Sequence, residues 1–214
     1  MERHGYRRPV GFFDRNRSQL EAQGIDPSRL PPGQYATDRF PVLHVGDVPR
    51  YASDLSDWDL RITGSVEQPL TLDFDELRTL PTVEETFDIH CVTKWSKFDT
   101  RWTGVRLTTL MALAGVRSSA THLVEHAEFG YTTNLPLADV RRDDVLVAWA
   151  FDGEPLEPEH GYPVRLVLPH RYFWKSAKWL RGLEFVDADR PGFWEQNGYH
   201  NDGDPFLEQR HWGD

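Results

Sequence analysis

Short runs in which apolar and polar residues alternate recur along the chain, and such alternation is typical of strands that bury one face. The first clear run extends from Trp58 to the turn at Gly64, and another carries Phe87, Ile89 and Cys91. The pattern after Cys91 predicts further strands at 121–126, 131–135, 145–151, 164–168 and 183–186.

Helical patterns are fewer and shorter. One helix is predicted at Phe74–Thr79, because Asp73 and Glu76 have the spacing of a capping box. A second is predicted at Thr108–Ala114, where Gly115 ends it. Strands outnumber helices, few connections are long enough for a crossover helix, and Pro and Gly turns are frequent. The sequence therefore predicts a strand-rich α+β domain.

The two ends of the chain differ from its middle. Residues 1–44 are polar and contain the Pro31-Pro32-Gly33 breaker, so we expect an extended N-terminal arm that packs on a domain formed by residues 45–190. The tail at 191–214 has no periodicity but many aromatic rings, so we expect it to fold back onto the domain. The expected anchors of the arm are Phe12, Phe13, Tyr35 and Phe40.

Composition narrows the class of protein. The formal net charge of −10 argues against a nucleic-acid binder with a broad basic face. A single cysteine excludes an internal disulfide, and no apolar run reaches the length of a membrane span. Arg7-Arg8 is not followed by the apolar region of an export signal, so a cytoplasmic location is predicted.

Cys91 lies at the end of a predicted strand and is followed by Lys94, Lys97 and Arg101. Nearby positive charge stabilises a thiolate, which is both a nucleophile and a soft metal ligand. These three cations are also candidates for attracting an anionic substrate. Free cysteines are often inert packing residues, so the stretch alone leaves both interpretations open.

The segment His160–Leu183 contains five cations and two histidines but no Asp or Glu, although the whole chain has 34 acids against 24 Lys plus Arg. Such a block indicates an anion site, because arginine binds phosphate in a bidentate manner and lysine adds a point charge. The small residues Ser176 and Ala177 would let backbone N–H groups approach an anion. The cations are Arg165, Arg171, Lys175, Lys178 and Arg181.

Two other chemistries fit the cysteine less well. A zinc site could use His90, Cys91 and the pair His122 and His126, but structural zinc usually needs four regularly spaced ligands. A cysteine nucleophile paired with a distant histidine has no local signature here.

Four motifs, in this order, resemble the sulfite oxidase-like molybdopterin oxidoreductases, which include sulfite oxidase, the molybdenum domain of nitrate reductase and bacterial methionine-sulfoxide reductase. The resemblance runs from about Leu55 to Tyr199 and is closest to small stand-alone bacterial and archaeal members. The motifs are HCVTKWS with the following WTGV, HGYPVRLVLP, WKSAKWLRGLEF and FWEQNGYH.

The resemblance implies a molybdenum atom held by the Cys91 sulfur and by the dithiolene of molybdopterin. It implies that His160 and Arg165 contact the pterin and its phosphate, and that Ser176, Ala177 and Lys178 lie against the cofactor. Tyr199 resembles the tyrosine that stands beside the metal, which implies that the tail at 191–214 completes the active site. The family has an Arg-Asn-His segment ahead of the cysteine. The corresponding region here, about residues 37–40, lacks that pattern, and Arg39 would take over cofactor binding.

The predicted activity is therefore two-electron oxo transfer on a small oxyanion or S-oxide. The sequence has no haem-binding or flavin domain, so we expect a separate electron-transfer partner. The competing hypotheses are a molybdopterin- or anion-binding module without turnover, and a small zinc protein.

Overall fold

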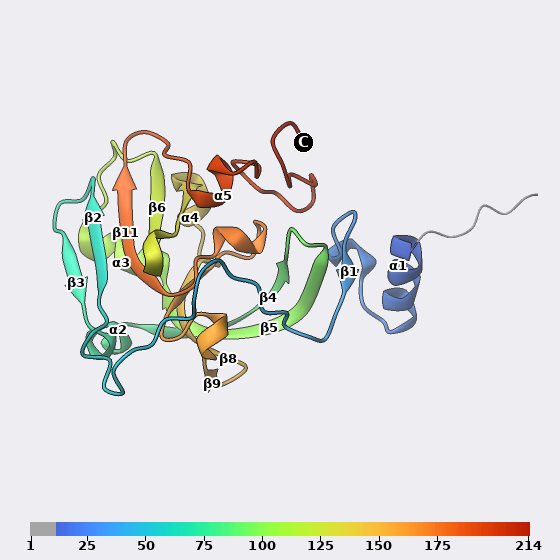
Figure 1. The fold of residues 1–214 in the computed structure, drawn as a ribbon, viewed down its shortest axis with the longest axis horizontal. Helices are drawn as coiled ribbons and strands as arrows, with labels where there is room; N and C mark the ends of the chain where they lie inside the picture. The colour runs from blue at the N-terminus through green and yellow to red at the C-terminus, as the bar shows by residue number, and fades with distance from the viewer. Residues whose placement is uncertain (1–11) are drawn as a thin grey trace, which may run out of the picture.

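The structure is a computed structural model that describes residues 12–214, with side chains from Arg15 onward. It contains two sheets and short helices, in agreement with the predicted α+β class (Figure 1). The helices are α1 (Phe12–Ala22), α2 (Phe74–Thr79), α3 (Leu107–Ala114), α4 (Leu137–Val140) and α5 (Phe193–Gln196), with 3-10 turns η1 (Pro27–Arg29), η2 (Glu128–Gly130), η3 (Pro158–His160) and η4 (Phe173–Lys175).

The strands form two mixed sheets. One has the order β3-β2-β11-β6-β7, and the other has the order β1-β5-β8-β10 with β4 paired to β5 and β9 to β8. The strand bounds are β1 Tyr35–Ala36, β2 Leu60–Gly64, β3 Leu70–Leu72, β4 Thr82–His90, β5 Trp95–Arg106, β6 His122–Ala127, β7 Thr132–Pro136, β8 Leu146–Phe151, β9 Glu154–Pro155, β10 Arg165–Val167 and β11 Leu180–Val186.

Local sequence explains the two predicted helices. The Asp73 carboxylate accepts the Glu76 N–H at 2.8 Å, and the Glu76 carboxylate accepts the Asp73 N–H at 3.0 Å, so α2 begins with a complete capping box. Helix α3 ends at Gly115, which has a φ of 63°. A left-handed residue at that place favours glycine, as expected from the sequence.

The long hairpin of β4 and β5 was not predicted as a hairpin. Alternate positions of β5 point inward, but several of them are polar or small, such as Ser96, Thr100 and Gly104, so apolar alternation does not reveal the strand. The hairpin extends from the domain toward β1 and α1 (Figure 1). Its β4 end carries Cys91 into the interior.

The sequence predicted an extended N-terminal arm, and this was wrong for residues 12–22, which form α1. Arg29 ties the arm to the hairpin through Asp88 at 2.7 Å and Asp99 at 2.6 Å. Phe40 is an anchor as predicted, with its ring 6.0 Å from that of Trp102. The side chains of Phe12 and Phe13, like Arg7 and Arg8, lie outside the described part of the chain.

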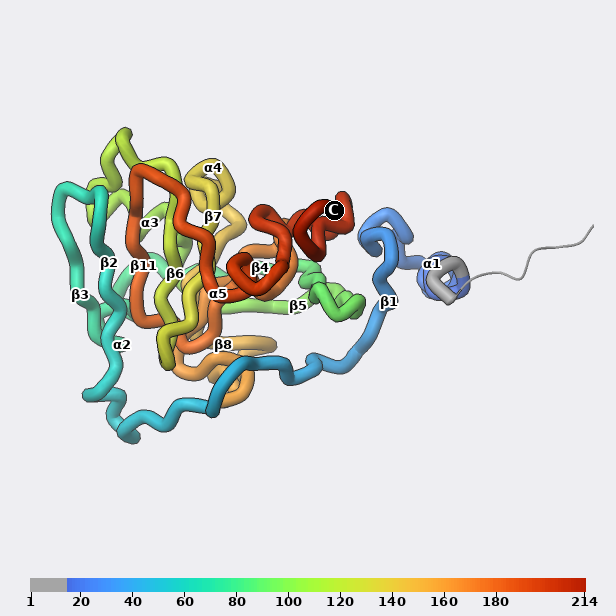
Figure 2. Tube along the Cα trace, turned by 45° about the horizontal axis from the view of Figure 1, so that its top comes forward, coloured from blue at the N-terminus to red at the C-terminus, as the bar shows by residue number. Residues whose placement is uncertain are grey.

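The C-terminal tail folds back as expected. The Tyr172 N–H donates to the Gly203 carbonyl at 2.7 Å, and Gly203 lies so close to the Trp174 ring that a Cβ there would meet the ring at 2.8 Å. Figure 2 shows the tail beside the β4–β5 hairpin, and shows residues of the N-terminal segment crossing the domain on their way to β2. The division of the chain at 44/45 and 190/191 stays a prediction.

Candidate active site

A cavity of about 330 Å³ lies where segments from distant parts of the sequence meet. One wall is a strap, defined here as residues 40–45, which has no regular secondary structure. Another is the turn that begins at Cys91, and a third is the 173–179 segment. The tail adds Trp194 and Tyr199, and Arg165 and Tyr131 complete the lining.

Cys91 is fixed by its backbone. Its N–H donates to the Trp95 carbonyl at 2.9 Å, and its own carbonyl accepts from the Gln34 amide and the Lys94 N–H, both at 3.0 Å. The sulfur lies 3.2 Å from the Thr93 hydroxyl and lines the cavity. These bonds hold the turn that connects β4 to β5, so the position of the sulfur is set by the hairpin.

Burial raises the pKa of the Cys91 thiol, and the Thr93 hydroxyl and the Lys178 ammonium offset this effect only in part. A raised pKa disfavours a free thiolate nucleophile, which argues against the cysteine-nucleophile interpretation. A coordinating metal removes the proton outright, so the same residue fits a metal ligand well.

Arg165 begins β10 and is completely buried. Its guanidinium donates to the His160 carbonyl at 2.8 Å, the Ser176 carbonyl at 2.9 Å and the Leu166 carbonyl at 3.3 Å. None of the ion pairs in the described structure includes it. Burial lowers its pKa to about 9. A buried cation without a carboxylate partner is costly, and a bound anion at the cavity would compensate for it.

Lys178 is the second cation of the cavity lining. Its ammonium donates to the Leu43 carbonyl at 2.9 Å and to the Glu159 carbonyl at 2.6 Å, so it also holds the strap. Burial, followed by repulsion from Arg165, lowers its pKa to about 7. The described lining contains no carboxylate, and the charged side chains of this cavity therefore favour an anion.

Anion binding should consequently weaken as the pH rises. Lys178 is charged at pH 6 and mostly neutral at pH 8.5, so we expect the affinity of the cofactor-free protein for sulfate to fall roughly tenfold between these pH values. Sulfate keeps its charge over this range. Isothermal titration in a His44→Gln background removes the imidazole of the strap from the measurement.

Lys178→Met in that background should bind sulfate weakly at both pH values. Lys97→Met is the matched control, because the Lys97 ammonium donates to the Asp38 carbonyl at 2.8 Å and does not line the cavity. A tenfold fall that persists in Lys178→Met would contradict the assignment of this charge.

The other three cations of the acid-free block are compensated by acids from other segments. Lys175 pairs with Glu195 at 2.7 Å, Arg171 with Asp139 at 2.8 Å, and Arg181 with Asp59 at 2.7 Å. Three of the five cations of the block are therefore paired with acids in the fold and do not line the cavity. Among the five cations of the block, Arg165 and Lys178 line the cavity and stay available to bind an anion.

Ser176 and Ala177 line the cavity, but not with free N–H groups. The Ser176 N–H donates to the Phe173 carbonyl at 3.3 Å, and the Ala177 N–H donates to the buried Glu125 carboxyl at 2.8 Å. Burial raises the pKa of Glu125 well above its usual value. The expected nest of these two N–H groups is therefore not formed, and the pair contributes to the wall instead.

Several predicted residues are not part of the cavity lining. Arg39 is exposed, and the His160 ring stacks on Phe40 at 3.9 Å while its Nε2 lies 3.1 Å from the Phe40 carbonyl oxygen. Neither residue is part of the cavity lining, and neither are the candidate cations Lys94, Lys97 and Arg101. Arg101 lies 3.7 Å from Glu84 instead. The structure therefore does not bring these side chains to the cavity.

Tyr199 lines the cavity, as the resemblance implies. Its ring stacks on Trp194 at 4.8 Å and meets the edge of Trp174 at 5.1 Å. Burial, followed by the charge of Cys91, raises the pKa of the phenol. The tyrosine therefore stands protonated near neutral pH and is available as a hydrogen-bond donor.

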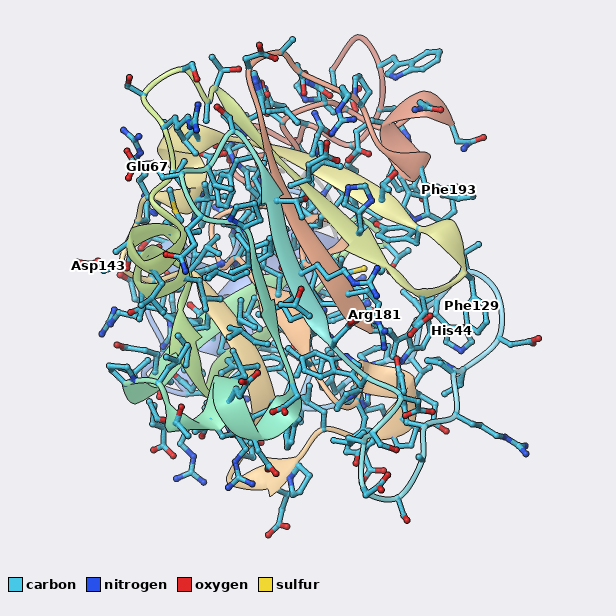
Figure 3. The ribbon with its side chains drawn as sticks, turned by 90° about the vertical axis from the view of Figure 1, so that its left-hand side faces the viewer. His44, Glu67, Phe129, Asp143, Arg181 and Phe193 are labelled. Atoms are coloured by element: carbon cyan, nitrogen blue, oxygen red, sulfur yellow. The ribbon has the colours of Figure 1, made fainter. Side chains whose placement is uncertain are left out.

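Sequence reasoning did not place Trp194 or the strap in the site, and it noted Trp174 only as one of the aromatic residues of the basic block that could supply stacking surface. Their only signal was the high aromatic content of the tail and of the basic block, which does not say which rings meet. Figure 3 shows His44 of the strap and Phe129 of η2 at the same edge of the molecule, and Gly46 lies close enough that a Cβ there would be 3.9 Å from the Phe129 ring.

The histidines considered for zinc have other partners. The buried His90 Nδ1 lies 2.9 Å from the Ser96 hydroxyl, and burial lowers its pKa to about 4. His126 lies 2.8 Å from Glu184. Within residues 12–214, His, Cys, Asp and Glu side chains do not gather into a group of three or more that could hold a metal. The zinc hypothesis is therefore not supported.

Comparison with known families decides the assignment. The model of the oxidoreductase molybdopterin-binding domain matches residues 45–194. The chain is a member of this family. Membership in this family confirms two predictions: the chain is an oxidoreductase, and its cofactor is molybdopterin. The residues present fit that group, because the cavity offers one soft sulfur ligand and two cations that lack carboxylate partners among the described residues.

Individual proteins are similar over most of the chain. The chain is 51% identical over 188 residues to the oxidoreductase YuiH of Bacillus subtilis, with 88% of this chain and 94% of YuiH covered. It is 29% identical to the protein-methionine-sulfoxide reductase catalytic subunit MsrP of Gluconobacter oxydans, covering 72% of this chain and 57% of MsrP.

A solved structure agrees with the fold. The sulfane dehydrogenase SoxCD of Paracoccus pantotrophus has a TM-score of 0.59 and 27% identity, with 73% of this chain and 45% of that chain covered. The present chain thus spans about half the length of SoxCD and of MsrP. No helix in the described residues has the length and apolar character needed to cross a membrane, and the cytoplasmic location stays a prediction.

Proposed function

We propose that the chain is a molybdenum-molybdopterin oxidoreductase that reduces small uncharged S-oxides by two-electron oxo transfer, with Cys91 as the protein ligand of the metal. The observation that carries the proposal is the common cavity of Cys91, Arg165, Lys178 and Tyr199. These are four of the residues that the sequence motifs had singled out.

The two cations have a separate task from the tyrosine. Arg165 and Lys178 lie on the wall formed by β10 and the 173–179 segment, where they would neutralise the phosphate of the pterin. Ser176 and Ala177, which are part of this wall, would contact the cofactor. When bound, the cofactor supplies the two-electron couple and the acceptor for the oxygen atom.

The tyrosine end of the cavity favours an uncharged substrate. Trp174 and Trp194 flank Tyr199, and the described lining offers no cation besides Arg165 and Lys178. Because both would be occupied by the cofactor, an oxyanion would find no counter-charge there. Apolar groups of an S-oxide would pack on the rings. The name of MsrP, a methionine-sulfoxide reductase, supports the same substrate class.

The reaction breaks the S–O bond, reduces sulfur by two electrons, and consumes two protons to give a thioether and water. The electrons come from a separate electron-transfer protein, for which a reduced dye can substitute in an assay. Tyr199 would donate a hydrogen bond to the S-oxide oxygen and so stabilise the negative charge that develops on it.

A dye-oxidation assay tests this proposal. Protein produced with molybdate in a cofactor-making host should oxidise reduced methyl viologen with methyl phenyl sulfoxide at least about 10-fold faster than with nitrate, because only the S-oxide is uncharged. Dye reduction driven by sulfite should be weak. Faster turnover of nitrate or sulfite would overturn the substrate class, and no turnover of any of these with a full load of molybdenum would favour the binding-module hypothesis.

A further inference from the structure

Lys175 and Glu195 form an ion pair that is almost completely removed from solvent. The ammonium lies 2.7 Å from one carboxylate oxygen, and the two side chains are 0% and 1% exposed. Neither residue lines the cavity. Burial of two charges is expensive, so the pair depends on further hydrogen bonds.

Those hydrogen bonds come from Trp174, which lines the cavity, and from two residues of β7. The Glu195 Oε1 accepts the Trp174 indole N–H at 2.9 Å and the Thr133 hydroxyl at 3.0 Å. The Lys175 ammonium donates to the Asn134 carbonyl at 2.8 Å and to its side-chain oxygen at 3.0 Å. The carboxylate thus fixes the Trp174 ring relative to β7.

The Glu195 side chain also anchors the short helix that contains the second ring, Trp194, because it accepts the Thr133 hydroxyl of β7. Glu195 follows Trp194 in α5, a helix of four residues that is too short to hold its own position. The Glu195 carbonyl accepts the Trp212 indole N–H at 2.9 Å, and the Trp194 carbonyl accepts the Tyr199 N–H at 3.0 Å. The buried carboxylate thus bonds the Trp174 ring directly and anchors α5, in which Trp194 is its chain neighbour.

We propose that Glu195, with Lys175 as its charge partner, is a positioning residue that holds Trp174 and Trp194 against Tyr199. This inference rests on the proposed function for the role of Tyr199, but the geometry that it explains exists without the cofactor. The pair acts through the tyrosine and does not itself touch the reacting atoms.

A double-mutant cycle separates positioning from general stability. The paired change Lys175→Met with Glu195→Gln removes both charges while keeping similar volumes. We expect it to lower kcat for methyl phenyl sulfoxide by about 10- to 100-fold, because a displacement of about 1 Å at a reacting group has an effect of this size. In a Tyr199→Phe background the same change should lower kcat by less than about 2-fold, since the effect passes through the hydroxyl.

The matched control is Arg106→Gln with Glu85→Gln, a partly buried ion pair of the β4–β5 hairpin outside the cavity. It should lower kcat by less than about 2-fold in both backgrounds. The inference would be overturned if the paired change at Lys175 and Glu195 lowered kcat by the same factor in the wild-type and Tyr199→Phe backgrounds. If the double variant does not keep the near-ultraviolet circular dichroism of the wild type, Glu195→Gln alone is put through the same cycle.

A measurement without cofactor distinguishes failure of this inference from failure of the proposed function. In the cofactor-free protein, the tyrosinate absorbance that disappears in Tyr199→Phe reports the pKa of Tyr199. The paired change should move that pKa toward the ordinary value of tyrosine, because loosened rings expose the phenol. An unchanged pKa would contradict the positioning role, whatever the turnover of the loaded enzyme.

Discussion

Replacing Cys91 by serine is expected to remove molybdenum from protein that was produced with molybdate, and to lower S-oxide turnover by more than about 100-fold. Loss of a group that only supports a ligand costs about 10- to 100-fold in metal affinity or activity, so loss of the ligand itself should cost more. A serine hydroxyl is also a poor match for a soft metal site. Plasma mass spectrometry on wild type and variant measures the metal content.

Thr93→Val is the control for this experiment. It removes the hydroxyl that lies 3.2 Å from the sulfur but leaves the thiol, so it should retain molybdenum. Near-stoichiometric molybdenum in Cys91→Ser would show that the metal is held elsewhere, and would reduce Cys91 to a packing residue.

Changing Arg165 to glutamate is expected to abolish retention of the pterin. The substitution reverses the charge of a completely buried side chain that lines the cavity. The shape-conserving change Arg165→Met should weaken retention by at least about 30-fold, which corresponds to about 2 kcal/mol for the loss of one partner of a buried charge pair. Pterin fluorescence after oxidative release measures the bound cofactor.

Arg181→Gln is the comparison variant, because Arg181 pairs with Asp59 at 2.7 Å and does not line the cavity. It should keep the pterin. The melting transition of cofactor-free Arg165→Met reports whether the chain still folds, and a folded Arg165→Met that retains pterin like the wild type would contradict the assignment of Arg165.

Local pattern was sufficient for elements whose signal lies in neighbouring residues. Helix α2 is bounded by a capping box between Asp73 and Glu76, and both residues are visible in the sequence. Strand β5 was not predicted, because its buried positions include Ser96 and Thr100. These residues are stabilised by tertiary hydrogen bonds rather than by apolar character. Helix α1 begins at the border of the described residues, and its sequence has no strong apolar face.

The site could be predicted as far as chemistry resides in single motifs. Cys91, Arg165, Lys178 and Tyr199 line one cavity, as the motifs imply. Which cations of the basic block remain for an anion could not be predicted, because their partners come from elsewhere in the fold. Asp59 is 122 residues away from Arg181, for example, and sequence alone does not reveal such a contact.

The position of the aromatic tail has a consequence for synthesis on the ribosome. Both sheets are complete in sequence by Val186, but the wall that contains Trp194 and Tyr199 is translated afterwards. Domains generally fold in the order in which they emerge. During synthesis the thiol of Cys91 is therefore made about a hundred residues before the rings of Trp194 and Tyr199, which line the same cavity. A nascent chain halted after β11 would carry the sulfur in a pocket that lacks these rings.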